Sequence, residues 1–218
     1  MLNRLAAVLL LAVGFVHAQA DGDGDVVTAH NRRGDIATAF NQFDGRIHSI
    51  QINRLNAQGY NLWSDVHADG NDEMAFAAAM DSAGGVFLAG VRKDGGQKYF
   101  LLVKYFEGGG VQWERTDDAS NCTATSVEVD RQDDVVMGGV CRSGNSYSAR
   151  VVKYSVDGNR MWAQDYDGGG RNYIRGFSID YTGNISVTVE TVFGAYRDGS
   201  YATRTVVYSP SGQQVEVR

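Results

Sequence analysis

Residues 76–113 read FAAAMDSAGGVFLAGVRKDGGQKYFLLVKYFEGGGVQW, and this stretch decides the fold. It holds three short runs rich in Val, Phe and Tyr and the start of a fourth, separated by glycine-marked turns. Such runs are typical of β-strands joined by tight hairpins. No sustained helical periodicity follows residue 20. We therefore expect four strands, at 75–80, 85–92, 99–106 and 111–116.

The rest of the chain repeats this stretch about every 50 residues. Two sets of residues mark the period: Trp63, Trp113 and Trp162, and Asp81, Asp130 and Asp180. A period of this length is typical of propellers and solenoids, and four strands in each repeat favour a propeller. The sequence thus predicts an all-β fold, a β-propeller of four four-stranded blades. The repeats divide a single domain, 26–218, at about 26–75, 76–124, 125–174 and 175–218.

The marker residues have structural explanations. An Asp at the start of a hairpin turn bonds backbone amides two residues further on. One tryptophan in each blade is expected to pack between neighbouring blades, although a tryptophan stripe could also bind a sugar or a cofactor ring. We expect the four blades to close into a ring as a monomer. Association into a larger ring is the alternative, so the oligomeric state stays open.

The repeats resemble the bacterial SBBP β-propeller repeat, with the pattern Asp-x-x-Gly-x-Val/Ile, then Val-Lys-Tyr, then Gly-x-x-x-Trp. The segments that carry it are DSAGGV (81–86), LLVKYFEGGGVQW (101–113), RQDDVV (131–136), RVVKYSVDGNRMW (150–162) and DYTGNI (180–185). The fourth repeat departs from it, with Val207 in place of the lysine and Glu216 in place of the tryptophan. The Gly-x-x-x-Trp part is also similar to quinoprotein propellers, but this chain lacks their adjacent-cysteine disulfide. The resemblance implies a fold and no particular activity.

The first twenty residues have the features of a cleavable export signal. Arg4 precedes an apolar run at 5–16, and a small-x-small cleavage site ends at Ala20. The apolar run is too short to span a bilayer, which needs about 20 residues. We expect a secreted or periplasmic protein with no membrane span after cleavage, beginning with an acidic leader at 21–25.

Cys122 and Cys141 are the two cysteines of the chain, and they flank a predicted hairpin at 123–140. Counting outward from its turn places them opposite each other on neighbouring strands. An oxidising compartment permits their pairing, so we predict a structural disulfide. A reactive pair or a metal site is less favoured, because no Cys-x-x-Cys or His/Cys cluster accompanies them.

The net charge of −6 argues against a nucleic-acid partner, whose binding surface would be basic. The chain has no Gly-x-Ser-x-Gly and no His-Glu-x-x-His sequence. His30, His48 and His67 show no metal-ligand spacing. We therefore identify no catalytic residue and predict no organic cofactor.

In a propeller, the links between blades share one face with the loops of the middle strands. Three acidic loops, at 64–73, 117–121 and 165–172, would meet there. We name seven aspartates as candidate ligand- or cation-binding residues: Asp65, Asp69, Asp72, Asp117, Asp118, Asp165 and Asp167. Glu73 also lies in the first loop. Clustered carboxylates suit a hard cation such as Ca²⁺, and a solvated face of mixed charge is the alternative.

These observations favour an exported, non-enzymatic binding or scaffold module that acts through its acidic loop face, with a protein or a polysaccharide as partner. One alternative is a glycan hydrolase or lyase that uses a pair of carboxylates on that face. Another is a structural subunit of a surface assembly. An enzyme would need convergent carboxylates with perturbed pKa values in a pocket, whereas a binding module needs only a shaped surface.

Overall fold

The computed structural model describes residues 26–194 and 199–218, which form sixteen β-strands. No helix occurs in this part of the chain, and so none of these residues forms a helix that could cross a membrane. The prediction of an all-β fold is confirmed. The expected export signal and the acidic leader lie outside the described residues.

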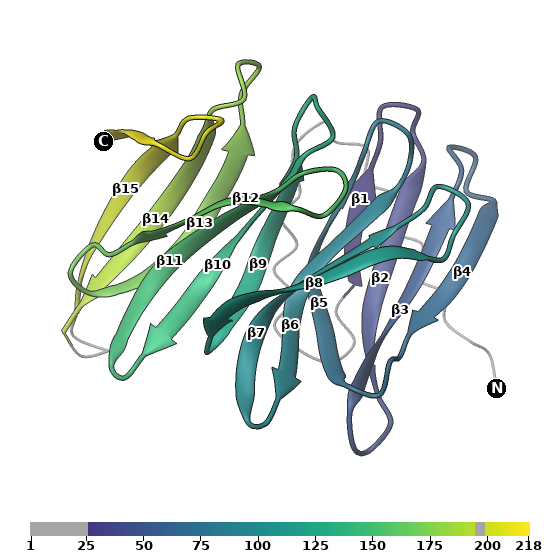
Figure 1. Ribbon diagram of the computed structural model, residues 1–218, viewed down its shortest axis with the longest axis horizontal. Coiled ribbons are helices and arrows are strands. Elements are labelled where there is room, and N and C mark those ends of the chain that lie inside the picture. Colours follow the sequence, from purple (N-terminus) through teal and green to yellow (C-terminus); the bar gives the residue numbers. More distant parts are fainter. Residues whose placement is uncertain (1–25, 195–198) are drawn as a thin grey trace.

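The strands form four consecutive units of four antiparallel strands, paired in chain order (Figure 1). One parallel pairing, Tyr147 with Arg171, also joins the third and fourth units into a single eight-stranded sheet. The first unit contains β1 (Val26–His30), β2 (Ile36–Phe43), β3 (His48–Leu55) and β4 (Asn61–His67). The second contains β5 (Asp72–Met80), β6 (Val86–Asp94), β7 (Gln97–Tyr105) and β8 (Val111–Ser120). The third contains β9 (Cys122–Val129), β10 (Val135–Ser143), β11 (Ser146–Tyr154) and β12 (Arg160–Tyr166). The fourth contains β13 (Arg171–Ile179), β14 (Ile185–Phe193), β15 (Ser200–Tyr208) and β16 (Gln214–Val217).

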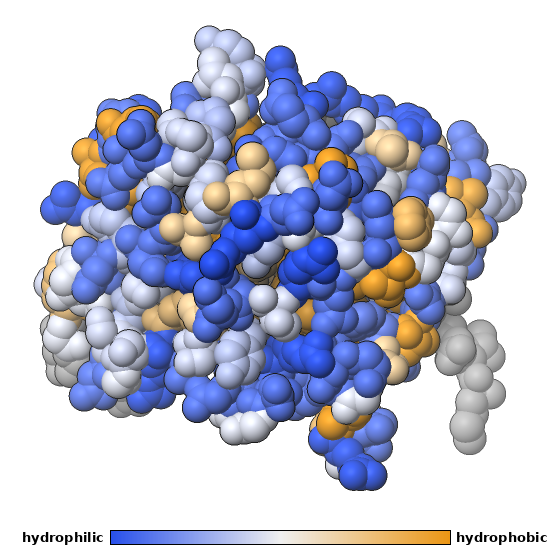
Figure 2. Space-filling model, in the orientation of Figure 1, coloured by the Kyte–Doolittle hydropathy of each residue, from blue (hydrophilic) through white to orange (hydrophobic). Residues whose placement is uncertain are grey.

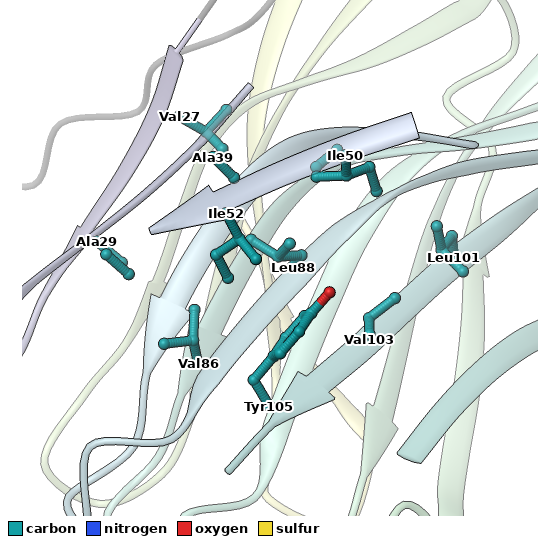
Figure 3. Close-up of a cluster of buried hydrophobic side chains, with 12 residues drawn as sticks. Val27, Ala29, Ala39, Ile50, Ile52, Val86, Leu88, Leu101, Val103 and Tyr105 are labelled. Carbon is teal, nitrogen blue, oxygen red and sulfur yellow. The ribbon is translucent and has the colours of Figure 1, made fainter. Parts of the chain in front are cut away.

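Neighbouring units pack face to face, and the hydrophobic cores lie between them. β5 packs against β1, β2 and β3 of the first unit, and the inner strands β9 and β13 pack in the same way on the second and third units. Figure 3 shows the first core, in which Ile50 and Ile52 of β3 meet Leu88 and Tyr105 of the second unit. Comparable cores join the second unit to the third and the third to the fourth. The apolar side chains on the face seen in Figure 2 lie in small, separate groups.

Each interface is completed by a tryptophan that reaches into the next unit. The indole Nε1 of Trp63 donates to the carbonyl of Glu107 at 2.8 Å, Trp113 donates to Val156 at 3.0 Å, and Trp162 donates to Pro210 at 2.9 Å. Each ring also covers a glycine in a turn of that unit: Gly109, Gly158 and Gly212, respectively. A Cβ on these glycines would lie 2.7–3.1 Å from the indole, and each glycine has a positive φ. Glycine is therefore required at these positions, because a side chain would collide with the indole and because the backbone has a positive φ.

The four units do not close into a ring, which corrects the closed monomer that the repeats led us to expect. The first and fourth units lie at opposite ends of the row in Figure 1. The fourth unit carries Glu216 at the tryptophan position, opposite Val207. In the first unit, a Cβ on the corresponding Gly59 would have no atom within 4 Å. The contact that joins the other units is thus missing from both ends of the described chain.

A buried ion pair recurs inside the units. The motif aspartate uses Oδ1 to accept from turn amides, as Asp81 does from Gly84 N at 2.8 Å and Asp130 does from Gln132 N at 2.9 Å. Its Oδ2 lies 3.3 Å from Nζ of Lys104 in the second unit and 2.7 Å from Nζ of Lys153 in the third. The Asp-x-x-Gly and Val-Lys-Tyr motifs are therefore two halves of one buried contact.

The units begin a few residues before the repeat boundaries that we predicted. β5, β9 and β13 start at Asp72, Cys122 and Arg171. Each of these strands contains a β-bulge where the predicted boundary falls, between Ala75 and Ala77 in β5 for example. A bulge interrupts the two-residue alternation of a strand, so the sequence pattern starts afresh after it.

Cys122 and Cys141 form the predicted disulfide, which is confirmed. They are cross-strand partners on β9 and β10, with an S–S distance of 2.02 Å. The bond closes the inner hairpin of the third unit.

Removing one interface tryptophan should destabilise the whole row. Trp113 is only 8% exposed and packs against Phe87, so Trp113→Ala should lower the free energy of unfolding by about 3–5 kcal/mol. Urea unfolding followed by circular dichroism measures this. Tyr181→Ala is the matched control, because Tyr181 is 76% exposed and its loss should change the stability by less than about 0.5 kcal/mol. Equal losses in the two variants would contradict the role that we give to the tryptophan.

Candidate functional site

One end of the row brings the links between units together with the middle hairpins. Asp72, at the start of β5, accepts hydrogen bonds from the backbone N and Nδ1 of His48, at 2.9 and 2.6 Å. Lys93, at the end of β6, lies 2.7 Å from the other oxygen of Asp72. Partial burial acts to raise the pKa of Asp72, but the Lys93 and His48 donors outweigh it and lower this pKa to about 2. Asp72 is thus a structural anion held by Lys93 and His48.

A group formed by the buried His67 and Glu73 and the partly exposed Glu114 lies at this end, between the first and second units. The Nε2 atom of His67 is 2.8 Å from Oε2 of Glu73 and 3.1 Å from Oε2 of Glu114. His67 ends β4, Glu73 is the second residue of β5, and Glu114 lies opposite Val103 on β8. Strand alternation sets His67 on the same face as Trp63, which packs in the first core. By the same alternation, Glu73 lies on the same face of β5 as Ala75, which is buried in the first core.

Arg92 holds the outer oxygens of the two glutamates. Its Nη1 forms a short ion pair with Oε1 of Glu114 and lies 3.4 Å from Oε1 of Glu73. Its Nη2 lies 3.5 Å from Asp69. Burial alone would lower the pKa of His67, but Glu114 and Glu73 raise it to about 9. We call His67, Glu73, Glu114 and Arg92 the first-interface cluster.

A second charged network lies between the second and third units. The side chain of Asp117, at the end of β8, is completely buried and lies 2.6 Å from Nε of Arg150 on β11. Arg150 also contacts Asp165 at 2.8 Å. Arg160 contacts Asp118 at 2.7 Å and Asp117 at 3.3 Å. The hydrogen bond and the charge of Arg160 lower the pKa of Asp118, although burial opposes them.

An open groove of about 890 Å³ runs beside this network, and we call it the central groove. The residues that line it come from the second and third units: Arg92, Asp94, Tyr99, Arg115, Thr116, Asp117, Asp118, Tyr154, Gly158, Asn159 and Arg160.

The third interface is organised by an amide. Asn172, which is fully buried on β13, donates to the carbonyl of Tyr147 at 2.7 Å and to Asp167 at 3.2 Å, and it accepts from Thr191 at 2.7 Å. A second open groove of about 720 Å³ lies here, and Asp167 and Tyr147 are among the residues that line it.

The seven predicted aspartates are distributed over all three interfaces, and five of them contact arginine, lysine or histidine. Asp69 contacts Arg92, Asp72 contacts Lys93 and His48, and the remaining three lie in the network of the second interface. Asp65 accepts from the backbone of Val66, and Asp167 accepts from Asn172 and Gly169. Among residues 26–194 and 199–218, three potential metal ligands come together only at His67, Glu73 and Glu114. The Ca²⁺ site stays a prediction.

Sequence reasoning overlooked His67 and Glu114. His67 has no nearby partner of its own type, and Glu114 lies 41 residues from Glu73, so no motif spacing connects them. A usable signal was present in the repeat. Glu114 follows Trp113 by one residue and His67 follows Trp63 by four, so strand alternation directs Glu114 toward the preceding unit and His67 toward the next one.

No family model and no curated protein matches the chain, so the SBBP-type resemblance stays a prediction from the motifs. Several solved structures are distantly similar to the chain, including the following two. A mannose phosphorylase from Leishmania mexicana has 10% identity and a TM-score of 0.44, covering 88% of this chain and 65% of that one. An endo-arabinase from Bacteroides thetaiotaomicron has 10% identity and a TM-score of 0.47, covering 92% of this chain and 82% of that one. This chain therefore spans less than two thirds of the phosphorylase, and likeness at this level indicates no activity.

Glu128 is a carboxyl group outside this end of the row. It lies on β9 opposite Val136, which belongs to the third core, and the structure gives it no hydrogen bond or ion pair within the described residues. Burial raises the pKa of Glu128 to about 7. Glu128 is the sixth residue after Cys122, which places it roughly 20 Å along the strand from the charged clusters.

Glu128 should make the protein less stable as the pH rises. Its folded-state pKa lies above its unfolded value, so the folded chain retains a proton that the unfolded chain releases between about pH 4.5 and pH 7. In the wild type, the free energy of unfolding should therefore fall by about 2–3 kcal/mol across this pH range, and in Glu128→Gln this fall should be absent. Urea unfolding at a series of pH values measures it. Glu190→Gln is the control, because Glu190 is paired with Arg175. If the free energy of unfolding of Glu128→Gln still falls with pH as it does in the wild type, Glu128 is not the group responsible.

Proposed function

We propose that this chain is an exported, propeller-type binding module that takes a neutral, polyhydroxylated ligand of the oligosaccharide class in its central groove. The observation that carries this proposal is the chemistry of the groove lining. It combines arginine, aspartate, asparagine and threonine side chains with the partly exposed ring of Tyr99. Polar groups converging beside an aromatic ring are typical of small-molecule sites.

The charges of the lining are balanced. Three arginines face three aspartates: Arg92, Arg115 and Arg160, and Asp94, Asp117 and Asp118. Several of these charges are already compensated, as Arg160 is by Asp118 and as Arg92 is by Glu114. A groove of this kind offers many hydrogen bonds without a strong net charge. It suits sugar hydroxyl groups, which both donate and accept, better than a polyanion or a polycation.

Binding fits the carboxylates better than hydrolysis does. A glycosidase pair needs one carboxyl group that is protonated near neutral pH. Arg160 lowers the pKa of Asp118, which keeps this groove carboxylate ionised. Glu128 has a raised pKa, but it lies near the opposite end of β9 and is not among the residues that line the central groove.

The disulfide supports the exported part of this proposal. Disulfides persist in oxidising compartments outside the cytosol, and Cys122–Cys141 closes a hairpin that contributes to the second core. The arrangement of four face-packed units supports the propeller-type part, with an open row in place of a ring.

A titration with oligosaccharides tests the proposal. The purified chain is titrated calorimetrically with soluble mannose and arabinose oligosaccharides, and the melting temperature is followed in parallel. We expect at least one oligosaccharide to bind and to raise the melting temperature. Tyr99→Ala should weaken binding about 10-fold by removing the ring from the groove, since one good contact is worth about 1.4 kcal/mol.

Tyr181→Ala is the matched control and should bind as the wild type does, because Tyr181 lies in the fourth unit. The proposal fails if no oligosaccharide binds, or if Tyr99→Ala binds unchanged. Release of new reducing ends from a bound oligosaccharide would replace binding with the hydrolase alternative.

A further inference from the structure

We propose that the first-interface cluster is a zinc-type metal site in which His67 Nε2, Glu73 Oε2 and Glu114 Oε2 are the protein ligands. The three atoms lie within 4.8 Å of one another. Ligands bound at about 2.1 Å in a tetrahedral arrangement are roughly 3.4 Å apart. The distances from His67 to the two glutamates, 2.8 and 3.1 Å, are a few tenths of an ångström shorter, so the three side chains would move slightly apart to admit an ion.

Buried atoms without a hydrogen bond provide a second observation. Glu73 is 1% exposed, and its Oε1 atom makes no hydrogen bond, although Arg92 lies 3.4 Å away in an ion pair. His67 is 6% exposed, and its Nε2 lies at contact distance from both carboxylates without forming a hydrogen bond of normal geometry to either. The buried hydroxyl group of Tyr105 also lacks a partner, and its ring packs edge-on against that of His67. Such groups in a protein interior call for a missing partner, for example an ion.

The second oxygens of the glutamates are held by Arg92, which leaves the Oε2 atoms directed at His67. Outer contacts of this kind orient the ligands of metal sites. The charges are also suitable for a divalent cation. A bound ion would displace the proton of His67, and the charges of Glu73, Glu114 and Asp69 would then exceed that of Arg92 by two negative charges.

The donor set selects the class of ion. One imidazole nitrogen with two carboxylate oxygens suits Zn²⁺, whereas Ca²⁺ prefers six to eight oxygen ligands. Glu114 is 22% exposed and Arg92 is 25% exposed, so the cluster has a side that is open to solvent. His67 belongs to the first unit and the glutamates belong to the second, so an ion bound here would tie the two units together. This inference does not rest on the oligosaccharide proposal, although Arg92 also lines the central groove.

Zinc binding by the full chain tests the inference. Protein dialysed against a chelator is titrated with ZnCl₂ by calorimetry, and Co²⁺ is added to a second sample to record its visible absorption bands. We expect one Zn²⁺ per chain, a higher melting temperature, and Co²⁺ bands typical of nitrogen and oxygen ligands. Loss of an outer contact alone lowers metal affinity about 10–100-fold, so Glu73→Gln should lower it by at least about 100-fold.

Glu114→Gln is the second variant, because this partly exposed ligand can be changed with less risk to folding, and it should also weaken binding. Glu190→Gln carries the same chemical change in the fourth unit and should bind zinc as the wild type does. The inference is overturned if the chain binds no stoichiometric Zn²⁺, or if Glu73→Gln and Glu114→Gln both retain wild-type affinity. Ca²⁺ binding with no zinc binding would also overturn it and would favour the aspartates of the loops.

Discussion

The stacking of an indole on a glycine of the next unit is the contact on which this structure depends. Trp113 fills the second interface because Gly158 has no side chain, and its Nε1 satisfies the carbonyl of Val156 in the same turn. One residue thus supplies apolar burial, a hydrogen bond and a fixed distance between two sheets. A four-stranded sheet has two faces, and an isolated unit could not bury either of them. The row is stable because each unit covers a face of the unit before it.

The same contact explains why the row ends. Three tryptophans serve three interfaces, and Glu216 replaces the fourth. The fourth unit has also lost the buried ion pair, since Val207 takes the place of the lysine and Asp180 is exposed. Asp180 keeps its turn-capping bond to the amide of Thr182, which requires no neighbouring unit. The last unit has thus lost both the tryptophan, which acts between units, and the ion pair inside the unit, and it has kept the local turn cap.

Much of this fold can be predicted from the sequence, because strand alternation, turn glycines and the 50-residue period are local or periodic signals. The disulfide was predictable because its cysteines are equidistant from one turn. The open row could not be predicted from the sequence. Closure depends on how neighbouring units are oriented, and the 50-residue period carries no information about that orientation. The candidate site was only partly predictable. The loop face and Glu73 followed from the topology, but the grouping of His67 with Glu114 depends on how two sheets are packed against each other.

One position in the inner hairpin shows how the first interface differs from the others. Glu73 lies opposite Arg92 in the second unit, Cys122 opposite Cys141 in the third, and Asn172 opposite Thr191 in the fourth. A disulfide or a neutral hydrogen bond therefore suffices to join these two strands. Buried ions are costly to desolvate and add little stability over apolar residues of similar size. Retaining a buried glutamate here, together with His67 and Glu114, is thus poorly explained by folding alone and is better explained by a ligand.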